Sequence, residues 1–239
     1  MYRKFADRNF IIVAVALDAG GADAVREFIR PREPIVVPAP MQAIMGWSAE
    51  QYAGAVAPTY PCLIDEKHIV AELYDVRNVP TAVWIDEEGR IVRPAEPAGA
   101  TDGFRSMDRK TFTLPSEVAE AGRAARASYT AALGDWIENG AQSRFALSED
   151  HARDRLSGPT ATDALAAASF KLGQHLHERG KPELAKRWFD EAARLCPDRW
   201  TYFRQALQLE EVGKASGPEF FAKLEALGDR RYYDEIRLD

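Results

Sequence analysis

A run of eight consecutive apolar residues near the start of the chain, Phe10 to Leu17, limits the folds open to this sequence more than any other feature. Isoleucine and valine make up half of the run, and Asp18 and then Gly20-Gly21 follow it. A short uninterrupted run of this kind predicts a strand buried on both faces, as in a parallel sheet that helices cover on either side. The run is much shorter than the about 20 residues of a membrane-spanning helix. We therefore predict an α/β fold.

Helical patterns flank this strand. Tyr2, Phe5 and Ala6 have the spacing of a helix that ends just before it, and residues 23–30 place apolar side chains on one helical face. Residues 31–58 are predicted to be a surface insertion, with one short helix from Ser48 to about Val56. Prolines exclude regular structure at the start of the insertion, at Pro31, Pro34, Pro38 and Pro40.

The α/β pattern resumes with a second short strand, Tyr60 to Asp65, and with an apolar helix face over residues 69–74. Residues 78–92 then hold two apolar runs joined by a polar turn that ends in Gly89, which predicts a β-hairpin. Pro80 stands at the start of the first run, where a strand tolerates the missing N–H. One more helix is expected over residues 102–109.

In this order the elements resemble the thioredoxin superfamily, in particular its redoxin branch of peroxiredoxins and thiol–disulfide reductases. The resemblance rests on residues 11–18, 60–65, 74–81 and 84–92, and it covers roughly residues 1–110. It implies a thioredoxin-like mixed sheet in which the Val79–Pro80 bond is cis and in which Val79, Pro80 and Thr81 bind an extended substrate. The alternative is a generic α/β hairpin domain in which Pro80 is an ordinary edge-strand proline.

The resemblance also implies a central first strand that ends in a Trp-Cys-x-x-Cys motif at a helix N-terminus, where the helix dipole lowers the pKa of the first thiol. This sequence lacks both, since Met1 corresponds to a position inside the helix that follows the motif. We expect a redoxin shortened at its N-terminus, with unpaired backbone and bare apolar faces on the strands beside the gap. A naturally degenerate form is the alternative.

No catalytic residue is expected in the chain itself. Its two cysteines, Cys62 and Cys196, form no Cys-x-x-Cys pair. Cys62 is expected to be a buried structural thiol within a strand, and Cys196 an inert thiol at a helix end.

The remaining polar candidates also predict no chemistry. His68 and His151 are expected to be solvated. His175 and His177 lie two residues apart on a helix and do not face each other, so we expect no metal site, and no cofactor is implied. Turn formation is the simplest role for the carboxylates that follow the predicted strands, Asp18, Asp65 and Asp86.

After Leu114-Pro115 the composition shifts to helix formers. A long helix capped by Ser116 and ending at Asn139, and a short one after Ser148, make residues 111–160 a predicted helical connector. Residues 161–239 are predicted to be helical and to begin with a hairpin of residues 162–179 and 182–196.

The hairpin resembles one tetratricopeptide repeat, and residues 200–227 resemble a degenerate second copy. The matching positions are Leu172, Gly173, Leu176, Gly180, Ala185, Phe189, Ala192 and Pro197. Because at least three repeats usually make an independent stack, the hairpin is expected to pack on the Ser116 to Asn139 helix or on the first domain.

The sequence thus predicts a thioredoxin-like redox protein, of the thiol–disulfide or peroxide reductase type, whose Cys-x-x-Cys site is missing from this chain. Its substrate would be a protein thiol or disulfide, or a peroxide. The alternative is a non-catalytic adaptor with a thioredoxin fold, and either protein could bind a peptide on its helical tail. The formal net charge of −6 argues against nucleic acid and anionic membranes as partners. Two cysteines and no N-terminal leader predict a cytoplasmic location.

Overall fold

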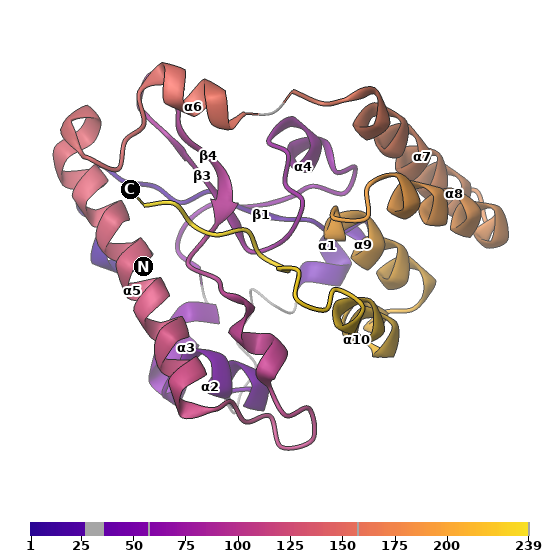
Figure 1. Ribbon diagram of the computed structural model, residues 1–239, viewed down its shortest axis with the longest axis horizontal. Helices are drawn as coiled ribbons and strands as arrows, with labels where there is room; N and C mark the ends of the chain where they lie inside the picture. Colours follow the sequence, from indigo (N-terminus) through magenta and orange to yellow (C-terminus); the bar gives the residue numbers. More distant parts are fainter. Residues whose placement is uncertain (27–35, 57, 157, 239) are drawn as a thin grey trace.

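The computed structural model describes residues 1–26, 36–56, 58–156 and 158–238 of the 239-residue chain (Figure 1). Helices dominate the described part, and the strands form two small sheets near its centre. The mixed α/β class predicted from the sequence is confirmed. The end of the helix expected over residues 23–30 and the first prolines of the insertion, Pro31 and Pro34, lie outside the described residues.

Each of the two sheets in the described residues has two strands. β1, Ala14–Ala16, pairs in parallel with β2, Cys62–Ile64, and β3, Thr81–Ile85, pairs antiparallel with β4, Ile91–Pro97. The prediction of a strand from Phe10 to Leu17 was wrong in length, because β2 offers only three residues for pairing. The predicted hairpin is confirmed.

The described part of the first half also contains short helices: η1 Tyr2–Lys4, α1 Gly21–Val25, α2 Ala39–Met45, α3 Ala49–Val56 and α4 Ile69–Leu73. The helix expected from Ser48 is confirmed as α3, and the Ser48 hydroxyl accepts a hydrogen bond from the Gln51 N–H at 3.2 Å. The prediction that Pro38 and Pro40 exclude regular structure was wrong. Pro38 precedes α2 and Pro40 lies in its first turn, where no N–H is needed.

The β3–β4 hairpin packs on the long helix α5, Ser116–Asn139, whose predicted limits are confirmed, although Pro115 rather than Ser116 is its N-cap residue. The Trp84 indole on β3 is buried there. Its Nε1 donates a hydrogen bond to Tyr129 Oη at 2.8 Å, and its ring stacks on Trp136 with the centroids 5.1 Å apart. This cluster, completed by Ala132, Leu133 and Phe145, is the core of the hairpin side of the molecule.

Three short helices adjoin α5 along the chain. The 3-10 helix η3, Asp102–Ser106, replaces the longer helix expected over residues 102–109, and η4, Gly140–Gln142, follows α5. α6, Glu149–Arg155, begins after Ser148, whose hydroxyl accepts a hydrogen bond from the His151 N–H.

A tight helical hairpin opens the last part of the chain, with α7, Ala161–Glu178, and α8, Pro182–Leu195, joined at Gly180. Gly173 permits the close approach of the two helices, because a Cβ atom there would stand 2.6 Å from ring atoms of Phe189. α9, Trp200–Glu210, η5, Lys214–Ser216, and α10, Pro218–Glu225, follow. The buried core of this part is Ala166, Phe170, Ala185, Phe189, Ala192, Cys196 and Tyr202.

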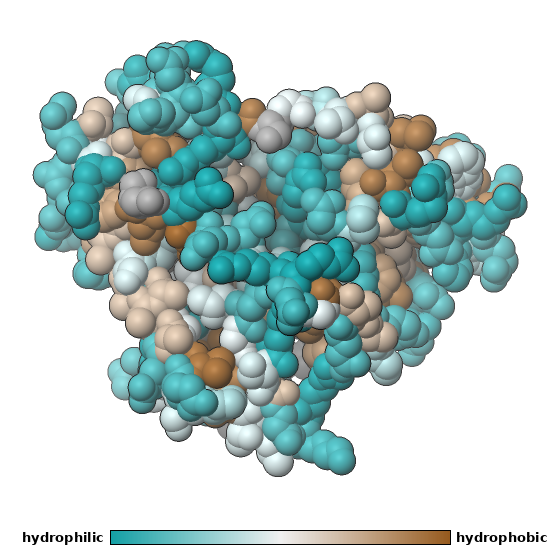
Figure 2. Space-filling model, in the orientation of Figure 1, coloured by the Kyte–Doolittle hydropathy of each residue, from teal (hydrophilic) through white to brown (hydrophobic). Residues whose placement is uncertain are grey.

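The chain then leaves the helices, and residues 230–238, named here the C-terminal segment, run without helix or strand (Figure 1). In Figure 1 this yellow segment crosses from α10 over the β3–β4 hairpin towards α5. Ile236 and Leu238 pack against the Trp84 cluster. The space-filling view shows mostly hydrophilic residues across the middle of this face (Figure 2). The C-terminal segment therefore returns from the helical part to the sheet.

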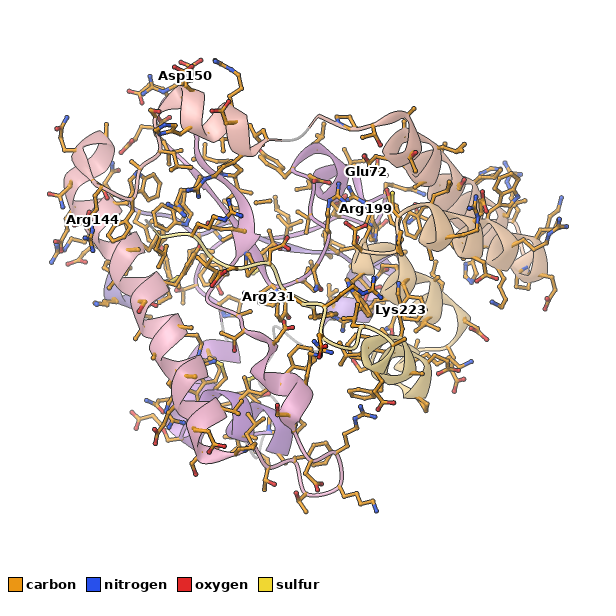
Figure 3. The ribbon with its side chains drawn as sticks, in the orientation of Figure 1. Glu72, Arg144, Asp150, Arg199, Lys223 and Arg231 are labelled. Atoms are coloured by element: carbon orange, nitrogen blue, oxygen red, sulfur yellow. The ribbon has the colours of Figure 1, made fainter. Side chains whose placement is uncertain are left out.

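The α7–α8 hairpin docks on the first half of the chain rather than standing apart. Lys171 Nζ on α7 lies 2.6 Å from Glu72 Oε2 on α4, and Gln174 Nε2 donates a hydrogen bond to the Glu66 carbonyl oxygen at 3.1 Å. At the start of α9, Arg199 pairs with Asp75 (Figure 3). The hairpin was expected to pack on the Ser116 to Asn139 helix or on the first domain, and these contacts are with the first domain. None of the described helices is long and apolar enough to cross a membrane.

The packing of α7 against α8 makes a direct prediction for Ala185, which is buried between them. Ala185→Arg should destabilise the protein by more than about 3 kcal/mol, because the guanidinium would be an unpaired charge in an apolar core. Ala168→Arg, on the exposed side of α7, is the matched control and should change stability by less than about 0.5 kcal/mol. Urea unfolding followed by circular dichroism measures both, and equal stabilities would contradict the packing.

Candidate functional site

The residues predicted to bind substrate are Val79, Pro80 and Thr81. They form a sharp turn at the start of β3, named here the corner at Val79. The Val79–Pro80 bond is cis, as the sequence predicted, and the Pro80 ring is exposed. The Asn78 side chain accepts a hydrogen bond from the Val79 N–H at 2.9 Å, and Thr81 Oγ1 donates one to the Asn78 carbonyl oxygen at 2.6 Å. Local hydrogen bonds therefore fix the corner.

The C-terminal segment lies directly on this corner. Tyr233 Oη donates a hydrogen bond to the Val79 carbonyl oxygen at 2.7 Å, and Asn78 Nδ2 donates one to the Tyr232 carbonyl oxygen at 2.9 Å. The two carboxylate oxygens of Asp102 accept the N–H groups of Tyr232 and Tyr233, each at 2.8 Å. Burial raises the pKa of Tyr233, so its hydroxyl remains a donor at neutral pH. Nothing in the sequence pattern indicated this contact.

The outer edges of β1 and β3 have no partner strand among the described residues. Ala14 N–H and Ala16 C=O bond towards β2, so by alternation the N–H and C=O of Val15 point to the opposite edge. On β3, Pro80 C=O and Asp86 N–H bond towards β4, which leaves Val83 pointing away from it. Exposed apolar side chains lie near these two edges, at Ile11 and Val13 before β1 and at Ile85 on β3, and Leu63 and Ile64 on β2 are exposed as well. Unpaired edges and exposed apolar faces are what the sequence led us to expect.

The two thiols occupy different environments and different elements. Cys62 on β2 is exposed, so the prediction of a buried structural thiol was wrong: β2 lies with all three of its residues open to solvent. Cys196, which follows α8, is buried, and burial above all raises the pKa of its thiol to about 11. A thiol with so high a pKa is a poor nucleophile at neutral pH, as the prediction of an inert Cys196 requires.

The carboxylates that follow the strands accept hydrogen bonds from backbone N–H groups in turns, as the sequence predicted. Asp18 Oδ1 accepts the Gly20 N–H, and Asp65 accepts the N–H groups of Ile69 and Ala71 at the start of α4. Asp86 accepts the Arg90 N–H and pairs with its guanidinium, which lowers the pKa of that carboxyl. Among the described residues, no group of three or more His, Cys, Asp and Glu side chains could hold a metal ion.

His68 is the polar residue that sequence reasoning placed wrongly. It was predicted to be solvated, but it is fully buried against Phe170 of α7, with the ring centroids 5.0 Å apart. Neither ring nitrogen has a hydrogen-bond partner among the described residues. Polar Glu66 and Lys67 precede it, and its φ of 54° is typical of a turn. The apolar residues that follow it, Ile69 and Val70, begin α4, so the burial is revealed only by the docking of α7 that creates it.

The charged groups that face His68 come from several elements. They are Asp65 before α4, Asp18 after β1 and Arg199 at the start of α9, whereas the neutral Gln205 amide is engaged with Ala19 N–H and Leu17 C=O. Burial outweighs the nearby carboxylates and lowers the pKa of His68 below its usual value.

A small hollow of about 250 Å³ lies beside this junction, between α4 and α7. Its two lysines already have partners: Lys67 pairs with Glu178, and Lys171 with Glu72. The hollow therefore presents no free charge for an anionic ligand. In the described residues, the outer edges of β1 and β3 have no partner strand, and the Val79 carbonyl oxygen accepts a hydrogen bond from the distant C-terminal segment.

No protein-family model matches this chain, and no curated protein or solved structure matches it either.

The buried, neutral His68 predicts a pH dependence of stability. In the unfolded chain the pKa of His68 returns to about 6.5, whereas in the folded protein it is lower. Between these two pKa values the unfolded state is protonated at His68 and the folded state is not, so lowering the pH favours unfolding. The unfolding free energy therefore carries the full contribution of neutral His68 above about pH 6.5, and this contribution is lost as the pH falls towards the pKa of His68 in the folded protein.

His68→Asn removes this titration and keeps a residue that tolerates positive φ. Between pH 7 and 5, the fall in unfolding free energy should become shallower by up to about 1.4 kcal/mol per pH unit. His151→Asn, at an exposed histidine on α6, should leave the slope unchanged. Urea titrations at several pH values measure the slopes, and an unchanged slope in His68→Asn would contradict the assignment.

Proposed function

We propose that residues 1–239 are the substrate-holding part of a thioredoxin-like redox protein that acts on protein thiols and disulfides or on peroxides. The observation that carries this proposal is the pair of unpaired strand edges on β1 and β3, together with the order of the elements: a parallel β1–β2 pair, then α4, then an antiparallel hairpin. A strand inserted between β1 and β3 would join the two small sheets into one mixed sheet. That arrangement resembles the thioredoxin fold expected from the sequence.

The corner at Val79 supports the substrate part of the proposal. Its carbonyl oxygen already accepts a hydrogen bond from outside the corner, namely from Tyr233 Oη, so it is oriented towards a neighbouring chain segment. An extended peptide could satisfy the same acceptor with a backbone N–H. Val79, Pro80 and Thr81 are the proposed contacts.

The chemistry requires two thiols, or a thiol and a selenol, in one motif. The first attacks a substrate disulfide as the thiolate or selenolate, and the leaving sulfur takes a proton. The second then displaces the substrate, so that the substrate carries two thiols and the motif is oxidised. A dithiol reductant must restore it. Exposed Cys62 and buried Cys196 lie on different elements and cannot form such a motif, so the proposal assigns it to a strand and helix supplied from outside residues 1–239.

A non-catalytic adaptor is the second candidate, and exposed apolar side chains on β2 and α4 favour it. Leu63 is 52% exposed, Ile69 is 53% exposed and Leu73 is 77% exposed. Apolar side chains gathered on neighbouring elements are typical of protein-binding surfaces. A peptide partner on the α7–α8 hairpin also remains a prediction under either function.

The coding sequence immediately before the Met1 codon tests the proposal. The redox function requires an in-frame apolar strand pattern followed by two cysteines, or a cysteine and a selenocysteine codon, separated by two residues. The chain extended to include them should reduce insulin disulfides, and serine in place of either active residue should abolish the activity. Absence of such a pair, or an inactive extended chain, overturns the redox function in favour of the adaptor.

Residues 1–239 by themselves should reduce neither insulin disulfides nor hydrogen peroxide above the uncatalysed rate, because they contain no paired thiols. Cys62→Ser should leave this baseline unchanged, since its thiol only hydrogen bonds the Tyr60 carbonyl oxygen. Turnover at thioredoxin-like rates that disappears in Cys62→Ser would show that this exposed thiol is a nucleophile.

A further inference from the structure

We propose that the C-terminal segment is an intramolecular ligand of the corner at Val79, and that the surface beneath it is a groove that binds peptides of similar sequence when the segment is displaced. The groove is lined by Asn78 at the corner before β3, by Arg93 on β4, and by Asp102 and Arg105 of η3. The proposal concerns peptide binding, and only its consequence for a substrate at Val79 depends on the proposed redox function.

The contacts in the groove resemble those of a bound peptide because protein side chains recognise the main chain of the segment. Asp102 accepts two successive N–H groups, those of Tyr232 and Tyr233, and Asn78 donates to the Tyr232 carbonyl oxygen. Arg105 donates to the carbonyl oxygens of Gly228 and Arg230, each at 2.8 Å, and Arg93 donates to that of Arg237. Recognition of main-chain atoms is independent of the side chains of the segment, and this independence allows another peptide to replace it.

Specificity for the sequence of the bound peptide comes from side chains of the segment that pack in apolar surroundings at two places. Tyr232 is buried among aromatic rings, with its centroid 5.2 Å from that of Phe104 and 4.6 Å from that of Trp200. Ile236 and Leu238, two residues apart on one side of the extended chain, pack against the Trp84 cluster. The preferred ligand is therefore a peptide that bends at a Tyr-Tyr pair and continues with alternating aliphatic residues.

The outer half of the segment is the weaker half. Asp234, Glu235 and Arg237 are exposed, whereas Ile236 and Leu238 are only partly buried. Arg231, which precedes the tyrosines, also lies on the outside of the molecule over the hairpin (Figure 3). Displacement can therefore begin at residues 234–238 and proceed to Tyr233, whose departure frees the Val79 carbonyl oxygen. While the segment is bound, the Tyr233 hydroxyl donates to this acceptor and the segment lies where a substrate strand would have to approach it.

The C-terminal segment is covalently linked to its own groove, and this link determines how the site can be tested. The segment acts on its own groove at an effective concentration on the order of millimolar, so a free peptide of the same sequence competes poorly. The apparent dissociation constant of a free peptide equals its intrinsic value divided by the fraction of molecules with an open groove. Weakening the segment within the chain should therefore increase the measured affinity for the free peptide.

The probe is a fluorescently labelled peptide with the sequence of residues 230–238, titrated by anisotropy onto the full chain. Ile236→Asp combined with Leu238→Asp places carboxylates against the Trp84 cluster, and this variant should bind the probe at least about tenfold more tightly than the unaltered chain. Asp234→Asn combined with Glu235→Gln changes exposed side chains of the same segment and should bind like the unaltered chain.

A folded Ile236→Asp, Leu238→Asp variant that binds no more tightly overturns the proposal. If that variant does not fold, Tyr233→Phe in the full chain decides, because it keeps the ring and removes only the hydrogen bond to the Val79 carbonyl oxygen. It should bind the probe about three- to tenfold more tightly, and unchanged binding overturns the proposal. The assay involves no thiol chemistry, so its failure leaves the redox function standing, and a failed insulin assay leaves the groove standing.

Discussion

The buried guanidinium of Arg93 is the interaction on which the architecture of the hairpin side depends. Its side chain is only 1% exposed, and it forms two hydrogen bonds with the Glu96 carboxylate at 2.8 and 2.9 Å. It also donates to the carbonyl oxygens of Phe145 and Arg237 and lies over the Trp84 ring. A buried charge is tolerated only where pairing and hydrogen bonds replace its lost hydration. One side chain on β4 therefore links the hairpin to the loop after α5 and to the C-terminal segment.

Both proposals depend on groups of the main chain. β1 and β3 expose unpaired edges, and the Val79 carbonyl oxygen is engaged by Tyr233. These groups suit partners that are themselves extended polypeptide: a strand between β1 and β3, and a peptide along the groove beneath the C-terminal segment. The same kind of recognition therefore relates the proposed redox function to its proposed regulation. A strand would complete the sheet, and release of the segment would open the corner to substrate.

Sequence reasoning succeeded where local patterns decide the structure. The limits of α5, the start of α8 at Pro182, the turn of the β3–β4 hairpin and the turn roles of Asp18, Asp65 and Asp86 all follow from spacing, proline geometry and short-range hydrogen bonds. Sequence reasoning failed where contacts between segments far apart in the chain determine the structure. The burial of His68 arises from the docking of α7, the exposure of Cys62 from an uncovered β2, and the contact of Tyr233 with Val79 joins residues 154 positions apart. Pro38 and Pro40 misled for a different reason, since proline breaks a helix interior but suits its first turn.

The central claim is that β1 and β3 present open edges that accept a strand. Amide hydrogen exchange of residues 1–239, resolved by residue with NMR, tests it most directly. We expect rapid exchange at Val15 and Val83, whose N–H groups point to the open edges, and slow exchange at Ala16 and Trp84, whose N–H groups point towards their partner strands. Protection of Val15 and Val83 equal to that of Ala16 and Trp84 would show that the edges are already paired and cannot accept a strand.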